Sequence, residues 1–410
     1  MAEDEIARLR RGTVDVIPEG ALEERLTLAR RERRPLRVKL GADPSAPGLH
    51  LGHAVVLAKL RDFQELGHRV IFLIGDFTAR IGDPSGRSET RKPLDDETIR
   101  ENAATYAEQV FRILDRDRTE IRFNSEWMGT MTADGMVRLC GQYTVARILE
   151  RDDFSKRFRA ARPIGVHELL YPLVQGYDSV ALRADVEVGG TDQRFNLLVG
   201  REIQKAYDVP PQVVMTLPLL EGTDGVQKMS KSLDNYIGVT EPADEIFGKV
   251  MSISDALMWR WYEVLETAKA TEVRRAVDAG TLHPRDAKAD LAESQVARFH
   301  GAQAARLARH RFDERFGRGR LPAEMVEEQR RPGPMPAELS LPDLLLELGL
   351  TKSKSEARRL IGQGAVRIDG APVASDRYPV GSGARDGGAA TLLIEVGKRR
   401  ACRIVFEGDG

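Results

Sequence analysis

Two short apolar runs with one helix's length of chain between them constrain the fold of this chain more than any other feature. Leu36–Leu40 and Val70–Ile74 have the apolar, β-branched composition of buried strands. Between them, apolar residues recur at i, i+4 and i+7 before a glycine that can end a helix: Val56, Leu60, Phe63 and then Gly67. A strand, a helix and a strand of these lengths form the crossover unit of a parallel sheet. The sequence therefore predicts an α/β fold with a parallel-sheet core.

The same alternation continues to about residue 240. A strand is predicted where apolar residues alternate along 182–188, and another over Val213–Leu217. Both run into loops rich in Gly, Asp and Thr, where α/β proteins bind ligands. The helical stretch that starts near Glu97 is longer than a simple crossover needs. We interpret it as a helical insertion, packed against the sheet or against another subunit.

The rest of the chain divides into three segments. Residues 241–320 lack strand alternation and are predicted to be helical, while 321–340 have the proline-rich, charged composition of an exposed linker. Residues 341–410 predict a small α+β module, with a Leu344 to Leu348 helical stripe and a second helix capped by Ser355. An Asp369–Gly370 hairpin turn follows, and Cys402, Ile404 and Phe406 alternate in a last strand.

Composition excludes several classes of protein. Sixty-two basic residues against 63 acidic ones give a formal net charge of -1, so no overall basic character indicates a nucleic-acid or membrane partner. Two distant cysteines, Cys140 and Cys402, allow neither a disulfide framework nor a cysteine-based zinc site. The first twenty residues contain no apolar signal segment, and the strongest apolar run is too short to span a bilayer. We expect a cytoplasmic protein without a membrane partner.

The loop from Gly41 to His53 is the first segment with the chemistry of a binding site. It places His50 and His53 at a predicted helix start, where backbone amides and the helix dipole attract phosphate. At i and i+3 the two imidazoles point the same way and can donate hydrogen bonds to phosphate oxygens, while Gly52 allows a flat ring close to the backbone. A lone pair at this spacing is a weak signal, because such histidines are as often ordinary core or surface residues as ligands, and a metal site would lack a third ligand nearby. We therefore predict an anion site without a resident metal.

The second segment is Lys228–Ser232, which reads KMSKS and follows a glycine-containing loop. Lys228 and Lys231 can close over a triphosphate and neutralise the charge that develops on a leaving pyrophosphate. Two lysines at this spacing are commonplace by themselves, but here they share one α/β core with the histidine loop. The glycine patterns of the P-loop and of the dinucleotide-binding fold are absent from the sequence, which removes the support for those nucleotide folds.

Together the two segments resemble the HIGH and KMSKS motifs of the class I aminoacyl-tRNA synthetases, here spelled HLGH and KMSKS. A third constellation is Tyr171, Gln175 and Asp178, which fall on one face of a predicted helix; that spacing also fits a solvated helix edge. With the loops Ile81–Arg87 and Gly189–Gln193, this run closely resembles the bacterial tyrosyl-tRNA synthetases. The tail is similar to an S4-type RNA-binding domain. The resemblance extends from about residue 35 to the C-terminus.

The resemblance implies a class I Rossmann-like catalytic core with a helical insertion (1–240), an α-helical tRNA domain (241–320), a linker (321–340) and an S4-like RNA-binding domain (341–410). It implies that the substrate tyrosine is bound by Asp83, Tyr171 and Gln175 at its α-ammonium, Asp178 at its phenol hydroxyl and Gln193 near its carboxylate. The residues implied for ATP and adenylate are Gly41, Asp43, His50, Gly52, His53, Gly190, Asp192 and Lys231. Those implied in catalysis are His50, His53, Lys228, Lys231, Ser45, Arg87 and Arg91, the last two on a mobile loop.

Two departures from the family matter. Many relatives have Lys where Arg87 stands, which keeps the charge but alters its geometry. Many also have a tyrosine at the position of Lys39, where its hydroxyl helps to bind the substrate phenol. The resemblance gives Lys39 no role, and phenol recognition is expected to rest more heavily on Asp178.

The implied reaction has two steps. L-tyrosine and ATP, with Mg²⁺ on the phosphates, first form tyrosyl-adenylate, and the tyrosyl group is then transferred to the terminal ribose of tRNA(Tyr). The implied assembly is a homodimer joined through the core. A synthetase-derived RNA-binding or regulatory protein without catalysis is an alternative, although a binding scaffold has no physical need for both phosphate clamps. A tryptophanyl enzyme is a nearer alternative, for which Asp178 and the S4-like tail are both unexpected.

A local basic patch in the tail is the predicted tRNA contact. The patch consists of Lys352, Lys354, Arg358 and Arg359, around the single acid Glu356. A solvated surface helix would have the same composition.

Overall fold

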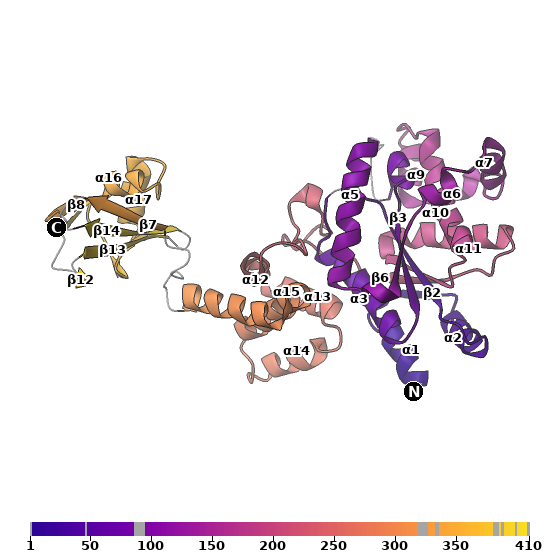
Figure 1. Ribbon diagram of the computed structural model, residues 1–410, viewed down its shortest axis with the longest axis horizontal. Helices are drawn as coiled ribbons and strands as arrows, with labels where there is room; N and C mark the ends of the chain where they lie inside the picture. Colours follow the sequence, from indigo (N-terminus) through magenta and orange to yellow (C-terminus); the bar gives the residue numbers. More distant parts are fainter. Residues whose placement is uncertain are drawn as a thin grey trace. The chain divides into compact units, whose positions relative to one another are not determined.

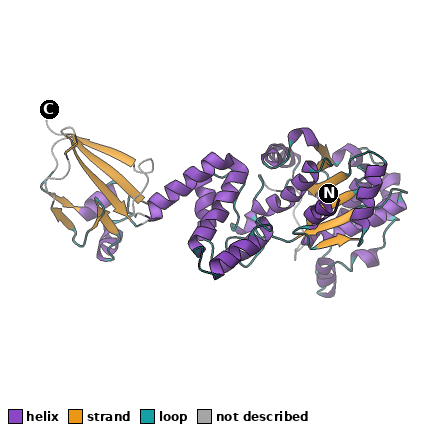
Figure 2. Cartoon of the chain, turned by 90° about the horizontal axis from the view of Figure 1, so that it is seen from below, coloured by secondary structure: helices purple, strands orange, loops and turns teal. Residues whose placement is uncertain are grey.

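The chain forms two compact units, Met1–Ala302 and Gln303–Gly410. The structure, a computed structural model, describes residues 2–45, 47–85, 95–317, 327–332, 336–379, 385–386, 389–397 and 400–407 (Figures 1 and 2). Helix α15, Pro284–Gly317, crosses the boundary between the units, and Gly301 within it has a non-helical φ of 84°. The predicted arginines Arg87 and Arg91 lie outside the described residues.

A six-stranded sheet forms the centre of the first unit, with the strand order β1-β6-β5-β2-β3-β4. The strands are β1 Asp15–Ile17, β2 Arg37–Ala42, β3 Arg69–Ile74, β4 Thr119–Phe123, β5 Val186–Gly190 and β6 Val213–Leu217. All pairs are parallel except β1 with β6. The order reverses between β2 and β5, because the chain runs outward through β3 and β4 before it returns. Such a switch point opens a crevice at the carboxyl ends of the strands.

Four helices cover the two faces of this sheet. Helix α3 (Leu51–Glu65) joins β2 to β3, α5 (Asp96–Gln109) joins β3 to β4, α10 (Val166–Ala181) leads into β5 and α11 (Arg194–Ala206) joins β5 to β6. Right-handed crossovers place helices on opposite faces when the chain reverses direction across the sheet. In Figure 1, α3 and α5 accordingly lie on one side of the strands and α10 and α11 on the other. The predicted strand–helix–strand unit is confirmed.

Shorter helices complete the first unit: α1 Ala2–Arg10, α2 Ala21–Arg31, α4 Thr78–Ile81, α6 Ser125–Met128, α7 Ala133–Cys140, α8 Val145–Ile148, α9 Asp152–Arg159, α12 Ala243–Ser252, α13 Asp255–Leu265 and α14 Ala270–Asp278. Helices α7 and α9 pack with α10 and α11 around Leu139, Phe154, Leu173 and Ile203. The helical character predicted beyond residue 240 is confirmed by α12 to α15.

Two details of the core differ from the sequence prediction. Helix α5 is the crossover between β3 and β4, whereas the sequence suggested an insertion, because β4 was not recognised. Strand β4 lies at the sheet edge with every residue half-buried, so its sequence TEIRF lacks a clear apolar face. The strand predicted from Leu182 begins only at Val186, since Leu182 caps α10 and Arg183 turns with φ of 46°.

The second unit is built on an antiparallel sheet with one parallel edge strand, in the order β10-β9-β13-β14-β7. Its elements are β7 Glu327–Pro332, β8 Glu338–Ser340, α16 Leu341–Glu347, α17 Lys354–Gly362, β9 Val366–Ile368, β10 Ala371–Pro372, β11 Arg377–Pro379, β12 Arg385–Asp386, β13 Ala389–Val396 and β14 Arg400–Glu407. Positive φ at Asp369 and Gly370 confirms the predicted hairpin turn. The prediction that Ser355 caps α17 is wrong, because the N-cap is Ser353. Its Oγ accepts from Glu356 N (3.1 Å), and the Glu356 carboxylate accepts from Lys352 N.

Candidate active site

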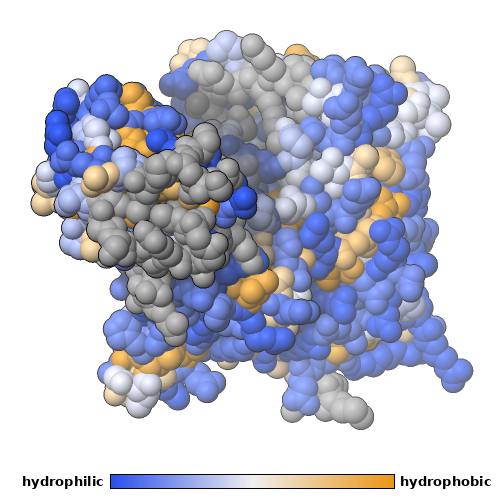
Figure 3. All heavy atoms as spheres, turned by 60° about the vertical axis from the view of Figure 1, so that its left-hand side comes forward, coloured by the Kyte–Doolittle hydropathy of each residue, from blue (hydrophilic) through white to orange (hydrophobic). Residues whose placement is uncertain are grey.

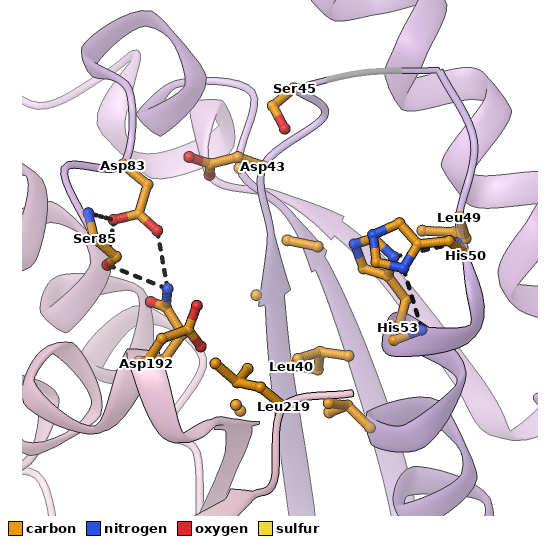
Figure 4. A pocket seen from close by; sticks show the side chains of 18 of the residues that line it. Leu40, Asp43, Ser45, Leu49, His50, His53, Asp83, Ser85, Asp192 and Leu219 are labelled. Atoms are coloured by element: carbon orange, nitrogen blue, oxygen red, sulfur yellow. Dashed lines mark hydrogen bonds between the residues drawn. The ribbon is translucent and has the colours of Figure 1, made fainter. Parts of the chain in front are cut away.

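A cavity of about 970 Å³ opens at the switch point of the first sheet. It is lined by the loop that follows β2, the start of α3, one face of α10, the loop that follows β5 and the KMSKS segment. Figure 4 shows His50 and His53 on one wall and Asp83, Ser85 and Asp192 on the other, with Leu40 of β2 between them. The cavity therefore has a histidine end and a carboxylate end.

The two histidines fold over the start of α3. His50 is the N-cap, and its Nδ1 accepts from Gly52 N (3.1 Å), while His53 Nδ1 accepts from His50 N (3.2 Å). The ring centroids are 4.0 Å apart. Gly52 is required here, because a Cβ would lie 2.9 Å from the His50 ring. Since both Nδ1 atoms act as acceptors, each neutral ring carries its proton on Nε2.

Both imidazoles are held in the neutral form. Burial, followed by the charges of His53 and Lys231, lowers the pKa of His50 to about 2. Burial, followed by Lys231, lowers the pKa of His53 to about 4. The pair can thus offer two uncharged N–H donors to an anion at neutral pH.

The histidine loop is fixed from two sides. From α5, Gln109 Oε1 accepts from Leu49 N (2.6 Å) and Asn102 Nδ2 donates to Pro44 O (3.0 Å). On the other side, Leu51 N donates to Ile237 O and Val239 N donates to Leu49 O. Because residues 237–239 follow the KMSKS segment closely, these two backbone hydrogen bonds connect the histidine loop to the chain just beyond that segment.

The lysines of the KMSKS segment approach the cavity differently. Lys228 Nζ pairs with Asp192 Oδ2 at 3.0 Å. Lys231 lies over the Tyr236 ring, 5.7 Å from its centroid, and burial lowers its pKa. Gly48 makes room for the Lys231 ammonium, because a Cβ there would approach Nζ to 3.0 Å. Ser45 lines the same cavity.

At the carboxylate end, Asp83 is the acceptor of a small network. Its Oδ1 accepts from Ser85 N (2.8 Å) and Ser85 Oγ (2.6 Å), and its Oδ2 accepts from Gln193 Nε2 (2.9 Å). Arg151, which is 6% exposed, lies 3.5 Å from Asp83 and donates to Asn196 Oδ1 at 3.0 Å. The network joins two loops from different parts of the sequence.

Tyr171 ties Asp43 into this end of the cavity. The tyrosine hydroxyl donates to Asp43 Oδ2 at 3.0 Å, and Thr78 Oγ1 donates to Asp43 Oδ1 at 2.7 Å. Burial and the nearby carboxylates raise the pKa of Tyr171. Asp43, predicted on the ATP side, therefore contacts a residue predicted to bind the amino acid.

Asp178 lies deepest among the predicted residues. It is 2% exposed, accepts from Trp127 Nε1 at 2.9 Å and lies 3.4 Å from Asn124 Nδ2. Burial raises the pKa of Asp178 to about 7, against the opposing effects of Lys39, Trp127 and Asn124. Helix α10 carries Tyr171, Gln175 and Asp178 on its cavity face, as the spacing predicted.

The structure brings nearly all the predicted core residues together around the cavity. Those lining it are Gly41, Asp43, Ser45, His50, Gly52, His53, Asp83, Tyr171, Gln175, Asp178, Gly190, Asp192, Gln193, Lys228 and Lys231. Around these residues lie side chains that the sequence interpretation missed, Trp127, Asn124, Thr78 and Arg151. Asn124 directly follows β4, so recognition of that strand would have placed it at the same sheet edge.

The basic patch of the second unit is exposed but more neutralised than predicted. Lys354 pairs with Asp343, and Arg358 pairs with Asp376 at 3.0 Å. The sequence interpretation considered only Glu356, because the other two acids are distant in sequence. Four basic side chains thus share their surface with three carboxylates. On the face drawn in Figure 3, hydrophilic residues predominate and apolar ones form small scattered groups.

Comparisons with known proteins identify the family. The model of the class I tRNA synthetases (W and Y) matches residues 31–317, and that of the S4 domain matches residues 340–386. A tyrosine–tRNA ligase of Geobacter sulfurreducens is 53% identical over 406 residues, 98% of this chain and 99% of the relative. One from Coxiella burnetii is 53% identical over 409 residues, 98% of each chain.

Solved structures agree with the fold. The tyrosyl-tRNA synthetase of Archaeoglobus fulgidus, solved with L-tyrosine, superposes with a TM-score of 0.60 at 24% identity, covering 75% of this chain and 99% of that one. Among the described residues, no helix is both long and apolar enough to cross a membrane.

Proposed function

Because the chain belongs to the tyrosine–tRNA ligase family of the class I tRNA synthetases, we propose that its cavity binds L-tyrosine at the carboxylate end and ATP at the histidine end. The family joins tyrosine to tRNA and uses ATP as a substrate. The observation that carries the assignment of the two ends is the buried Asp178–Trp127 contact, which places a carboxylate in the lining of the cavity away from the histidines. Such a carboxylate can accept a hydrogen bond from the phenol hydroxyl, the group that distinguishes tyrosine from phenylalanine.

In the first step the tyrosine carboxylate attacks the α-phosphorus of ATP. One P–O bond forms to the carboxylate oxygen, and the bond to the bridging oxygen of the leaving pyrophosphate breaks. The nucleophile is already an anion, so no general base is needed. Catalysis then depends on positioning and on stabilisation of the charge that moves to the pyrophosphate.

The histidine end supplies this stabilisation. His50 and His53 present Nε2–H groups, since their Nδ1 atoms are occupied by backbone donors. Lys228 and Lys231 add positive charge from the KMSKS segment, and Lys228 exchanges its Asp192 partner for phosphate when ATP binds. We propose that Mg²⁺ enters with the substrate, as the Mg²⁺ complex of ATP, because this ion is usually held in large part by substrate phosphates.

The carboxylate end orients the amino acid. Asp83, Tyr171 and Gln175 are proposed to hold the α-ammonium, with Gln193 near the carboxylate and Asp178 at the phenol. Buried Gln175 Oε1 has no hydrogen-bond partner among the described residues, which leaves an acceptor available for an ammonium donor. Asp192 and Gly190 are proposed to contact the adenylate ribose. Arg87 and Arg91 remain predictions from the sequence.

In the second step a hydroxyl of the terminal ribose of tRNA(Tyr) attacks the tyrosyl carbonyl and releases AMP. The S4 domain suggests RNA binding by the second unit. We propose that the patch of Lys352, Lys354, Arg358 and Arg359 contacts tRNA phosphates, and that residues 241–320 form a helical tRNA domain. The division into 1–240, 241–320, 321–340 and 341–410 is retained as part of this proposal, although strands β7 and β8, which lie within 321–340, pair with strands of the segment 341–410.

We also propose that the protein is a homodimer joined through its core. Six large apolar side chains are more than half exposed among the described residues, and four of them come from the short stretch of α7 to α10: Val137, Val145, Phe158 and Val166. These helices share one buried cluster, so the exposed side chains sit on a preformed surface. A second copy of the same surface is a complementary partner.

Exchange of labelled pyrophosphate into ATP tests the proposed function. We expect exchange that depends on tyrosine and that neither tryptophan nor phenylalanine supports at equal concentration. Exchange driven by tryptophan would favour the other specificity of the W and Y family. Tyrosine binding without any exchange would instead favour a protein that has lost catalysis.

A further inference from the structure

A charged cluster lies buried beneath the carboxylate end of the cavity, and the proposed reaction does not use it. Lys39 of β2 and Glu187 of β5 are paired positions on neighbouring strands, 0% and 1% exposed. Lys39 Nζ lies 2.9 Å from Glu187 Oε1, 2.8 Å from Ser179 Oγ and 3.4 Å from Gln175 O. Lys39 thus donates two hydrogen bonds, to Ser179 Oγ and Gln175 O, and forms an ion pair with Glu187, so its ammonium is engaged by protein groups beneath the cavity.

The cluster holds the turn of α10 that carries Asp178. Gln175 and Ser179 flank Asp178 in the helix, and Lys39 contacts both. Ser179 Oγ also donates to Glu187 Oε2 at 3.0 Å, and Gln212, just before β6, donates to the same oxygen. Side chains from β2, from β5 and from the residue just before β6 thus hold one turn of α10 in place.

Asp178 is faced by opposite charges from the two central strands. Lys39 stabilises its carboxylate form and Glu187 opposes it, so the first lowers and the second raises the pKa of Asp178. From the segment after β4, Asp178 receives only the neutral donors Trp127 and Asn124. Asn124 Nδ2 also donates to Thr78 Oγ1, which in turn donates to Asp43, so hydrogen bonds connect this side of Asp178 to a second carboxylate.

We propose that the buried Lys39–Glu187 pair positions Asp178 and balances its charge, and that Lys39 is therefore a specificity-determining positioning residue for tyrosine over phenylalanine. This inference rests on the proposed tyrosine site. A buried ion pair is costly to desolvate, and apolar side chains would fill the space at least as stably. The position of the Lys39–Glu187 pair beneath Asp178, the residue proposed to bind the phenol hydroxyl, accounts for the presence of charge there. Lys39 acts through Asp178 and does not contact the substrate.

The test compares Lys39→Gln and Glu187→Gln in the full chain. Dissociation constants for tyrosine and phenylalanine are measured by equilibrium dialysis without ATP from pH 5.5 to 9, and kcat and KM by pyrophosphate exchange. Tyrosine affinity is expected to fall on acidification as Asp178 takes up a proton, and we call this part of the pH profile the acid limb. We expect the limb to move to higher pH by about one unit in Lys39→Gln and to lower pH in Glu187→Gln, since the two charges act oppositely on the pKa of Asp178. The preference for tyrosine at pH 7 should fall about tenfold in Lys39→Gln, with kcat changed much less.

Glu168→Gln is the matched control. Like Glu187, Glu168 is a buried glutamate paired with a cation, Arg157, but it lies in α10 ten residues before Asp178, about 15 Å away along the helix axis. This variant should lose stability while the limb stays in place. A limb that moves in the same direction in both test variants, or in neither, would overturn the inference. So would a control that moves it as Lys39→Gln does.

Two further outcomes are separated by design. If Lys39→Gln does not fold, Glu187→Gln decides alone: a downward shift supports the inference and an unmoved limb overturns it. If the parent protein neither binds tyrosine nor supports tyrosine-dependent exchange, the proposed function fails. If the parent does both and the limbs do not move, only the inference about Lys39 fails.

Discussion

Replacing Asp178 by asparagine should make the free protein more stable above pH 7 while it damages tyrosine recognition. Asparagine has nearly the same shape and keeps an acceptor for Trp127 Nε1, so packing changes little. The change removes a charge that is almost completely buried, 2% exposed. Stability and function are therefore expected to move in opposite directions.

The magnitude follows from the pKa of Asp178, raised by burial from 3.8 to about 7. Between these values the folded state holds a proton that the unfolded state has released. Stability therefore falls as pH rises through this window, and it is level above it. At about 1.4 kcal/mol per pH unit, the stabilisation of Asp178→Asn relative to the parent should be about 3 kcal/mol larger at pH 8 than at pH 5.

Urea unfolding followed by tryptophan fluorescence measures this difference. All three tryptophans, Trp127, Trp259 and Trp261, belong to the first unit, so the signal reports the unit that contains Asp178. Parent and variant are compared at one protein concentration, at pH 5 and at pH 8. An unfolding free-energy difference that is the same at both pH values would refute the argument that Asp178 titrates near neutrality. Unimpaired preference for tyrosine over phenylalanine would refute its role at the phenol.

Three other perturbations test separate parts of the proposal. His53→Ala should slow tyrosyl-adenylate formation in single turnovers by roughly 10²- to 10³-fold with tyrosine affinity unchanged; weaker tyrosine binding at an unchanged rate would contradict the placement of His53. Val166→Asp, at a side chain that is 78% exposed, should dissociate the proposed dimer in sedimentation experiments, and a variant as dimeric as the parent would place the interface elsewhere. Reversing the four charges of the tail patch should weaken tRNA binding and reduce its log–log salt slope by about 0.7 to 0.9 for each phosphate that the patch no longer neutralises, with pyrophosphate exchange intact. An unchanged slope would mean that the patch does not bind phosphate.

The parallel core was predictable because its strands are buried on both faces. Val70–Ile74 is a continuous apolar run and Val213–Leu217 is interrupted only by Thr216, which is how strands covered by helices on both sides appear in a sequence. Edge strand β4 has no such signature, and its omission turned a crossover helix into an apparent insertion. The same omission hid Asn124 and Trp127, which approach Asp178 from just beyond that strand.

The candidate site was predictable where chemistry and local spacing coincide. The two histidines cap one helix and the polar stripe of α10 occupies one helical face, so both follow from the sequence period. Arg151 beside Asp83 and the tail acids Asp343 and Asp376 lie far from their partners in sequence. Glu187 left a trace, since it is the single charge of strand β5, whereas Lys39 shares strand β2 with Arg37. The pairing of Lys39 with Glu187 depends on strand order, which spacing alone does not give.

The two ends of the cavity stabilise charge by different means, and the chemistry of the reaction accounts for this. The amino acid must be discriminated before it reacts, and in the proposed site this is assigned to fixed, buried groups such as Asp178, whose burial has a desolvation cost. Pyrophosphate must be stabilised as it forms and then leave. Neutral imidazoles hold an anion less strongly than charged ones would, and Lys228 has Asp192 as an alternative partner within the same cavity. A fully charged histidine end would bind ATP and its product more tightly alike, which lowers KM without accelerating the step.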